Sequence, residues 1–349
     1  MNALVIGAQN PDDPAAAVRF VNDWAEPGAP GPGEARVRTL CSALNHLDLW
    51  VAKGVPGLRL TYPRVSGSDA CGVVESVGAG VDAAWVGARV ILNAAVEVKD
   101  AALPGGAPEP RLPNYELLGE HRPGVHAAMF NAPVTNLQRV DEGIEPTAAA
   151  AFGLTFLTAY SMLNKAGARP GEWVLITGIG GGVATAALAL ARELGLRTIV
   201  TSREQRKIDA AKQAGAEFGV VDTGEDWSRA VRQMTGGRGV DIAVDSSGKA
   251  THLKCIKSLT RGGAYVTPGC TSGADATTDL ARIFWNQLRI LGSTMGTNAE
   301  FASLARLLNA RKLKATVDRV FAAKDGAAAW KFLASGEQVG KVVIDWRGV

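Results

Sequence analysis

Hydrophobic and polar positions follow two patterns along this chain. Up to about residue 130, short apolar runs alternate with polar residues, as in EARVRTLCSALN (34–45), and Pro and Gly interrupt them often. An alternation of period two is typical of strands that are buried on one face. This part is therefore predicted to be a β-rich domain with many loops.

From about Trp173 onward, continuous apolar runs alternate with helical segments. The predicted strands are WVLITG, RTIVTS, FGVVD, VDIAVDSS, GAYVTPG and LRILGST, with helices beginning at Gly182, Glu204, Asp226 and Ala250. Such an alternation predicts a parallel sheet with helices on both faces. The apolar stretch 147–163 contains threonines and a glycine, and it is predicted to be a buried helix rather than a membrane span.

A cluster of glycines separates the first two predicted strands of this second part. It comprises Gly178, Gly180, Gly181 and Gly182, and a segment of small residues follows it. Glycine lets a backbone turn tightly and approach a pyrophosphate closely, and a helix N-terminus stabilises the negative charge. The complete βαβ context favours a dinucleotide site over a turn without a ligand. Gly180, Gly181, Gly182 and Val183 are therefore predicted to contact the cofactor.

The end of the second strand of this unit indicates which cofactor is used. It reads Thr201-Ser202-Arg203, where an NAD site often has an acid that accepts hydrogen bonds from the ribose. Hydroxyl and guanidinium donors would bind a 2′-phosphate, which a carboxylate would repel. We predict NADP(H), with Ser202, Arg203 and Lys207 around the phosphate; the alternative is that these are solvated charges at a helix start.

Composition narrows the functional classes. The 349 residues are 47% hydrophobic and 20% charged, with a net charge of +3, which argues for a globular protein and against nucleic acid or membrane partners. The four cysteines are scattered and form no C-x-x-C, as expected of free thiols in a reducing cytoplasm. No signal peptide is recognisable at the N-terminus, so a cytoplasmic location is expected.

Several motifs together resemble the medium-chain dehydrogenase/reductase superfamily. They are ALNHLDLW (43–50), GSDACGVVESVGAGV (67–81), FGLTFLTAY (152–160), VLITGIGGGV (174–183), VDSSG (244–248) and SGEQVGKVV (335–343). The resemblance implies an α/β fold: a GroES-like β-rich domain plus a Rossmann domain with a doubly wound parallel sheet. The expected boundaries are 1–130 for the GroES-like domain, 131–294 for the NADP-binding domain, and 295–349 for the return to the first domain.

The chain departs from the zinc-binding members of this superfamily. Positions that hold catalytic zinc in those members read Asn45, Ser68 and Ala151 here, and zinc favours thiolate and imidazole ligands. The position of a hydroxyl in their proton relay reads Leu47. The stretch 97–113, where the resemblance would place a structural zinc, contains no cysteine. Neither zinc is expected.

Without a metal, hydrogen-bond donors must stabilise the charge that develops on a substrate oxygen during hydride transfer. The candidate catalytic residues are Asn45, His46 and Ser68, and Asp48 and Trp50 are expected in the substrate pocket. Asn45 either donates to the substrate oxygen or bonds only neighbouring groups of the protein. His46 either donates to the substrate or contacts the cofactor pyrophosphate.

The resemblance also implies cofactor contacts outside the glycine cluster. Thr155 and Ser246 match positions that touch the nicotinamide half, and Lys341 matches a position near the cofactor phosphates. The sequence therefore predicts a zinc-independent NADP(H)-dependent oxidoreductase that acts on a small molecule, an activated carbonyl, enone or quinone. Alternatives are a zinc-type alcohol dehydrogenase and a non-catalytic NADP-binding protein. A homodimer is expected, paired through GAYVTPGC or LRILGST as an edge strand.

Overall fold

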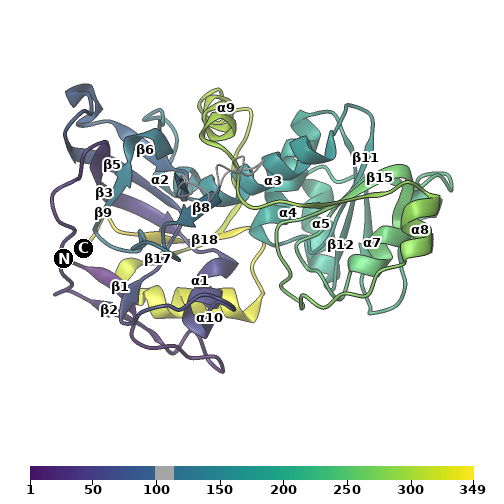
Figure 1. Cartoon of the computed structure of the whole chain (residues 1–349), viewed down its shortest axis with the longest axis horizontal. Helices are drawn as coiled ribbons and strands as arrows, with labels where there is room; N and C mark the ends of the chain where they lie inside the picture. The colour runs from purple at the N-terminus through teal and green to yellow at the C-terminus, as the bar shows by residue number, and fades with distance from the viewer. Residues whose placement is uncertain (99–113) are drawn as a thin grey trace, which may run out of the picture. The chain divides into compact units, whose positions relative to one another are not determined.

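The computed structural model describes residues 1–98 and 114–349. It consists of two compact units, each assembled from more than one stretch of the chain. The first unit contains Met1–Leu154, Thr297–Ala305 and Val317–Val349, and the second contains Thr155–Gly296 and Arg306–Thr316. Both ends of the chain thus belong to the first unit, where the two termini lie near one another (Figure 1).

The second unit is built on a six-stranded sheet whose neighbouring strands are all parallel in the described part of the chain. The strands are β11 (Trp173–Ile176), β12 (Arg197–Ser202), β13 (Phe218–Val221), β14 (Val240–Val244), β15 (Leu259–Thr267) and β16 (Arg289–Gly292). They lie in the order β13-β12-β11-β14-β15-β16. The direction of building reverses between β11 and β14, which defines the doubly wound arrangement and confirms the predicted fold class.

Helices cover both faces of this sheet. They are α3 (Gly153–Ala166), α4 (Gly182–Glu193), α5 (Gln205–Gln213), α6 (Ser228–Met234), α7 (His252–Ser258) and α8 (Leu280–Trp285). Helices α4 and α5 lie on one side and α7 on the other (Figure 1). The buried alanines of α4, such as Ala184 and Ala187, let this helix approach the sheet closely. It ends before Gly195, whose φ of +70° is the left-handed conformation that glycine favours.

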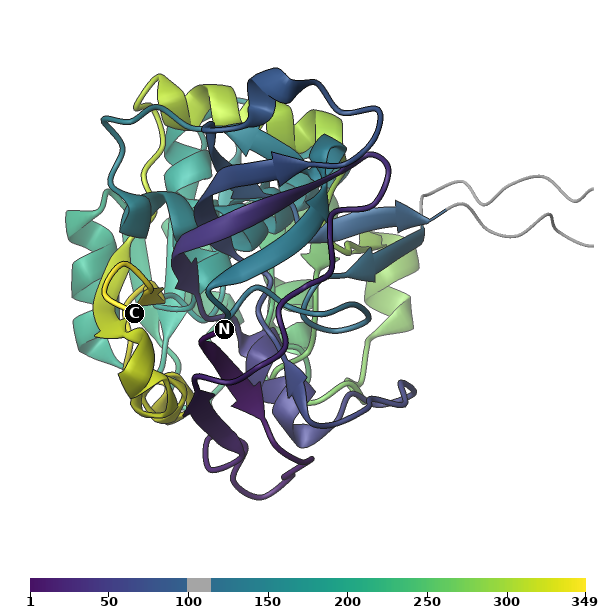
Figure 2. The ribbon, with the colours of Figure 1, turned by 90° about the vertical axis from the view of Figure 1, so that its left-hand side faces the viewer.

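In the described residues, the strands of the first unit form three antiparallel or mixed sheets (Figure 2). One joins β1 (Ala3–Ile6), β2 (Val18–Val21) and β4 (Arg64–Val65), and a second pairs β7 (Ala95–Val98) with β8 (Asn114–Leu117). The largest contains β3 (Glu34–Ala43), β5 (Ala70–Val77), β6 (Arg89–Leu92), β9 (Met129–Pro133), β10 (Leu137–Arg139), β17 (Val317–Ala322) and β18 (Lys341–Asp345). Since β9 pairs with β3, the expected boundary at residue 130 falls inside a strand of this unit.

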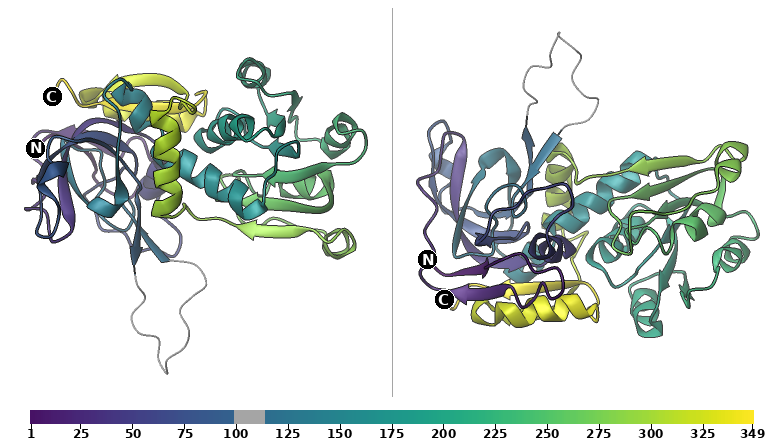
Figure 3. Two further views of the ribbon diagram at one scale, coloured as in Figure 1. Left: turned by 90° about the horizontal axis from the view of Figure 1, so that it is seen from above. Right: turned by 60° about the horizontal axis from the view of Figure 1, so that its bottom comes forward.

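The other described helices lie wholly or partly in the first unit. They are α1 (His46–Lys53), α2 (Pro146–Ala150), α9 (Asn298–Asn309) and α10 (Gly326–Ser335). Helix α10 lies beside β17 and β18 (Figure 3), and its Trp330 is fully buried with Leu4 and Ile6 in one hydrophobic cluster. No helix in the described ranges is both long enough and apolar enough to cross a bilayer.

Two local predictions differ from the structure. The stretch 147–163 forms two helices, α2 and α3, because the chain turns at Ala151 and Phe152 before Gly153 begins the second helix. The strand predicted from GAYVTPG is the carboxyl half of the longer strand β15, which pairs on both sides. Only β16, of the two strands expected at a dimer interface, lies at an edge of the sheet.

Candidate functional site

The glycine cluster forms a tight loop between β11 and α4. Gly178 and Gly180 have φ values of +63° and +109°, which side chains with a Cβ rarely adopt. The N–H of Ile179 donates to the carbonyl of Thr201 at 2.8 Å and so ties the loop to the end of β12. Gly181 is the N-cap of α4, so the free N–H groups of the first helical turn begin at this loop. This geometry fits a pyrophosphate.

Thr155 provides a second feature of the second unit that fits a ligand. Its side chain is 3% exposed on α3, and its hydroxyl has no hydrogen-bond partner within the described residues. A buried hydroxyl without a partner is costly, and a bound ligand can supply one. The predicted contact of Thr155 with the nicotinamide half stays a prediction, but the unpaired hydroxyl is compatible with it.

The end of β12 carries the residues predicted to recognise a 2′-phosphate. Ser202 is buried, and its Oγ accepts from the N–H of Glu204 at 3.2 Å. Arg203 is exposed. The Glu204 carboxylate lies 2.8 Å from the ammonium of Lys207 and 2.7 Å from Arg206, and Lys207 and then Arg206 lower its pKa. The predicted cations Arg203 and Lys207 are thus present, but Glu204 forms an ion pair with Lys207 and with the neighbouring Arg206.

Three strands of the first unit bring together a buried polar cluster. Asn45 follows the end of β3, Asp69 precedes β5, and Lys341 begins β18; the last two strands run antiparallel to β3 on either side of it. The Lys341 ammonium lies 2.8 Å from the Asp69 carboxylate and donates to Asn45 Oδ1. Asn45 Nδ2 donates to the same Asp69 oxygen at 2.9 Å. Asp69 and Lys341 are 0% and 3% exposed, so the pair is screened from water.

This cluster changes the interpretation of Lys341. The resemblance placed its ammonium near the cofactor phosphates, whereas the structure holds it against Asn45 and Asp69. Asp69 needs this cation because its other two donors, Asn45 Nδ2 and the N–H of Leu154 at 2.6 Å, are neutral. The second hydrogen of Asn45 Nδ2 has only a long contact, 3.5 Å to the carbonyl of Ala43, and can serve another acceptor.

Asp48 fixes the backbone of the same loop at Asn45. Its carboxylate accepts from the backbone N–H of Asn45 at 2.8 Å and lies 3.3 Å from Nε2 of the fully buried His126. Burial alone would raise the pKa of Asp48, but the nearby His126 and the hydrogen bond from the backbone N–H of Asn45 lower it overall. Asp48 was predicted to line a substrate pocket; at 1% exposure it instead fixes the start of α1.

Of the other predicted site residues of the first unit, Ser68 is buried and His46 is exposed. Ser68 is 1% exposed and donates to the carbonyl of Leu118 at 2.6 Å, so its hydroxyl hydrogen is already used. His46 is exposed and contacts Trp50 edge-on, with ring centroids 6.2 Å apart. Partial desolvation and then Lys53 lower the pKa of His46, which favours the neutral imidazole at neutral pH.

The residues at the expected zinc positions do not fit a catalytic zinc. Asn45 Oδ1 is held by Lys341, Ser68 is bonded to backbone, and Ala151 has no donor atom. In residues 1–98 and 114–349, no group of three or more His, Cys, Asp or Glu side chains could hold a metal ion. The prediction that no structural zinc is bound rests on the stretch 97–113. Residues 99–113 of that stretch lie outside the described residues.

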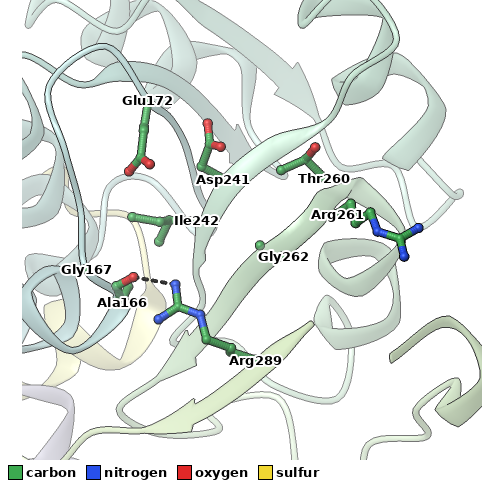
Figure 4. A pocket seen from close by; sticks show the side chains of 10 residues that line it. Ala166, Gly167, Glu172, Asp241, Ile242, Thr260, Arg261, Gly262 and Arg289 are labelled. Carbon is green, nitrogen blue, oxygen red and sulfur yellow. Dashed lines mark hydrogen bonds between the residues drawn. The ribbon is translucent and has the colours of Figure 1, made fainter. Parts of the chain in front are cut away.

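A pocket of about 200 Å³ lies in the second unit but does not belong to this site. It is lined by residues near the amino ends of strands and by Ala166 and Gly167 at the end of α3 (Figure 4). The glycine loop instead follows the carboxyl end of β11. Two of its charged side chains are bonded within the protein: Arg289 donates to the carbonyl of Ala166 at 2.6 Å, and Asp241 accepts from Arg238 and from the N–H of Trp173.

Sequence reasoning underrated two carboxylates. Neither Asp69 nor Asp245, which directly follows β14, was among the predicted site residues. Asp245 is fully buried and accepts from Thr177, Thr251 and Tyr265. An acid that ends a buried apolar run such as VDIAV was a usable signal, but its three hydroxyl partners come from separate segments that no local pattern connects.

Comparisons with known proteins agree with the fold. Residues 31–142 match the model of the alcohol dehydrogenase GroES-like domain, and residues 182–310 match the model named zinc-binding dehydrogenase. A 2-haloacrylate reductase of Burkholderia sp is 28% identical over 93% of this chain and 94% of its own length. An alcohol dehydrogenase of Geobacillus stearothermophilus is 29% identical over 82% of this chain and 84% of its own length.

A solved structure is also similar to this chain along its whole length. The crystal structure of an NAD-dependent alcohol dehydrogenase is 37% identical in sequence and superimposes with a TM-score of 0.90. The superposition covers 99% of this chain and 100% of the other chain. A GroES-like unit together with a doubly wound unit is found in relatives named as alcohol dehydrogenases and a reductase, and the chain is accordingly an oxidoreductase. The chain belongs to the medium-chain dehydrogenase/reductase superfamily.

Proposed function

We propose that this oxidoreductase is zinc-independent and uses NADP(H) to transfer hydride to a small molecule with an activated carbonyl, an enone or a quinone. The observation that carries the proposal is the buried Lys341 ammonium on Asn45 and Asp69. A side-chain cation thus neutralises the acid and occupies the amide oxygen at the position where zinc-binding relatives carry a ligand.

Zinc independence is supported by the donor set and not by the family name. The model named zinc-binding dehydrogenase matches residues 182–310, and none of the positions Asn45, Ser68 and Ala151 lies in that range. Neither an amide oxygen already bonded to an ammonium nor a hydroxyl bonded to backbone is a ligand that zinc favours. A zinc-type alcohol dehydrogenase remains the competing function, since alcohol dehydrogenases are among the relatives.

The charge at the end of β12 supports NADP(H). Arg203, Arg206 and Lys207 set three positive charges against the single carboxylate of Glu204, and the hydroxyl of Ser202 can donate to a phosphate oxygen. The competing choice is NAD, which the 37%-identical relative uses and whose ribose hydroxyls Glu204 could accept from. Arg203→Ala should weaken NADPH binding by about 1.5–3 kcal/mol and leave NADH binding nearly unchanged. Tighter binding of NADH than NADPH by the unmodified protein would refute the phosphate assignment.

The chain's own groups would bind and orient the reactants. The cofactor, when bound, supplies the hydride. The glycine loop and the start of α4 hold its phosphates, and the second N–H of Asn45 donates to the substrate oxygen as that oxygen gains negative charge. Lys341 and Asp69 fix the orientation of this amide, because they bond its oxygen and its nitrogen respectively. His46, with its lowered pKa, fits a hydrogen-bonding role better than that of a proton donor.

Within this substrate class, one comparison favours a conjugated double bond. The 2-haloacrylate reductase from Burkholderia acts on an alkene conjugated to a carboxylate, and it covers nearly the whole chain. Consumption of NADPH with a panel of enones, quinones, acrylates and aldehydes tests the function directly. Turnover with at least one class is expected; binding of NADPH without any turnover would instead support the non-catalytic alternative.

Metal content decides the zinc question. Elemental analysis should find well under one zinc per chain, and a chelator should change neither turnover nor thermal stability. Stoichiometric zinc that survives dialysis, together with activity lost on chelation, would establish the zinc-type alternative.

A homodimer through the second unit completes the proposal. The edge strand β16 exposes Ile290, and Leu280, Phe284 and Trp285 of α8 are 68–71% exposed. An edge strand leaves backbone groups unpaired, and a second copy of the same strand can pair with them antiparallel about a two-fold axis. Light scattering should give twice the chain mass, and Ile290→Lys should shift it to that of one chain. A monomeric unmodified protein would contradict the assignment.

A further inference from the structure

Asp245 is a buried carboxylate that the proposed function does not yet use. It is 0% exposed, directly after the end of β14. Its two oxygens accept from the hydroxyls of Thr177, Thr251 and Tyr265, the last at 2.9 Å, and from the N–H of Ser247 at 2.9 Å. An ionised carboxylate only accepts hydrogen bonds, so these converging donors fix the position of the Asp245 side chain and stabilise its charged form.

All of these donors are neutral. In the part of the chain that the structure describes, no lysine, arginine or histidine lies within ion-pair distance of Asp245. His252 lies near, edge-on to Tyr265 with ring centroids 4.6 Å apart, and burial lowers its pKa, so its imidazole is neutral at neutral pH. A buried charge without a partner of opposite sign costs several kcal/mol, and such groups cluster at functional sites.

The position of Asp245 relates it to the cofactor. Its partner Thr177 follows β11 directly and precedes the glycine loop, and β11 and β14 are the neighbours between which the strand order reverses. A Cβ placed on Gly178 would lie 3.2 Å from Ser247 Oγ, so the loops after these two strands touch. In the proposed assignment of the 2′-phosphate to Ser202 and Arg203, the adenosine end of the cofactor lies toward β12. The nicotinamide half must therefore extend toward β14 and β15.

We propose that the unpaired charge of Asp245 sets the preference of the site for the oxidation state of the cofactor. The nicotinamide ring is positively charged when oxidised and neutral when reduced. A buried negative charge near this ring attracts the oxidised form and leaves the reduced form almost unaffected, since little water screens it. The inference rests on the proposed use of a nicotinamide dinucleotide and adds a residue that tunes it.

The test compares dissociation constants for the two oxidation states, measured by calorimetry on the full chain. Asp245→Asn keeps the size of the side chain and removes the charge. The ratio of the dissociation constant of NADP⁺ to that of NADPH should rise about tenfold. Asp222→Asn is the matched control, because Asp222 is paired with Lys254 at 2.8 Å; it should leave the ratio unchanged.

A second variant keeps the inference testable if Asp245→Asn does not fold. Tyr265→Phe preserves the carboxylate and removes one neutral donor that disperses its charge. The ratio should then move in the opposite direction, about two- to threefold. If Asp245→Asn weakens the binding of NADP⁺ and of NADPH equally, Asp245 has a structural role only and the inference is overturned. If Asp245→Asn cannot be measured, an unchanged ratio in Tyr265→Phe overturns the inference instead.

The same experiment separates this inference from the proposed function. All proteins are also measured with NAD⁺ and NADH, so the result does not depend on the 2′-phosphate. If the unmodified chain binds none of the four nucleotides, the proposed function fails. If it binds them and the charge variant leaves the ratio unchanged, only the role of Asp245 fails.

Discussion

Replacing Lys341 by methionine isolates the energy of the buried cation. Methionine retains most of the apolar stem and removes the ammonium, which leaves the carboxylate of Asp69 with neutral donors only. Removing one partner of a buried ion pair typically costs about 3–5 kcal/mol. Because Asn45 Nδ2 and the N–H of Leu154 still donate to Asp69, at 2.9 and 2.6 Å, the loss should lie near the lower limit, at about 3 kcal/mol.

The chain has two compact units, so a single unfolding transition cannot be assumed. Hydrogen–deuterium exchange of peptides from β3 and β18 therefore measures the loss of stability within the first unit alone. The double variant Asp69→Asn with Lys341→Met removes both charges. It should recover most of the loss, because a neutral amide carries a far smaller desolvation cost than an unpaired carboxylate.

Lys249→Met is the matched control. Lys249 also lies 2.7 Å from a carboxylate, that of Asp275, but the two side chains are 53% and 77% exposed. An exposed pair contributes about 0–1 kcal/mol, so this variant should be nearly as stable as the unmodified chain. A loss below about 1 kcal/mol for Lys341→Met, or a double variant as unstable as the single one, would refute the argument that the buried charges depend on each other.

Other variants test the remaining assignments. Asn45→Ala should lower turnover roughly 10²-fold, about 2.7 kcal/mol, with little change in NADPH affinity, and Asn45→Asp should be worse; near-normal turnover of the aspartate variant would exclude the amide as the donor. Gly181→Val should abolish nucleotide binding and preserve the fold, because Gly181 has φ −74° and an added Cβ would lie 3.4 Å from the carbonyl of Gly178; unaltered affinity in equilibrium dialysis would place the phosphates elsewhere. Asp48→Asn should destabilise the first unit at pH 7, and the difference should vanish as the pH falls through the lowered pKa of Asp48, because a carboxyl with a depressed folded pKa contributes stability only above it. A difference that does not shrink as the pH is lowered below the ordinary pKa of an aspartate, in denaturant titrations, would contradict that linkage.

Local sequence patterns were sufficient for the parts of the fold that local geometry controls. The period-two alternation of β3 and the apolar runs of β11, β12 and β14 follow directly from how side chains alternate or are buried on a strand. The glycine loop was recognisable because a turn with positive φ and a helix start need specific residues within a few positions of one another. The fold class was therefore determined by the sequence alone, and the position of the glycine loop, where a dinucleotide is predicted to bind, was determined with it.

Tertiary structure decided which charged side chains meet. Lys341 bonds Asn45 and Asp69 across separations of 296 and 272 residues, and only the register of β3 with its two antiparallel neighbours places them together. Glu204 lies next to its partners in sequence, yet which cation it contacts depends on rotamers at the start of α5. Side-chain periodicity records burial at each position, whereas electrostatic partners depend on strand pairing between distant segments, and a single sequence carries no local signal of that pairing.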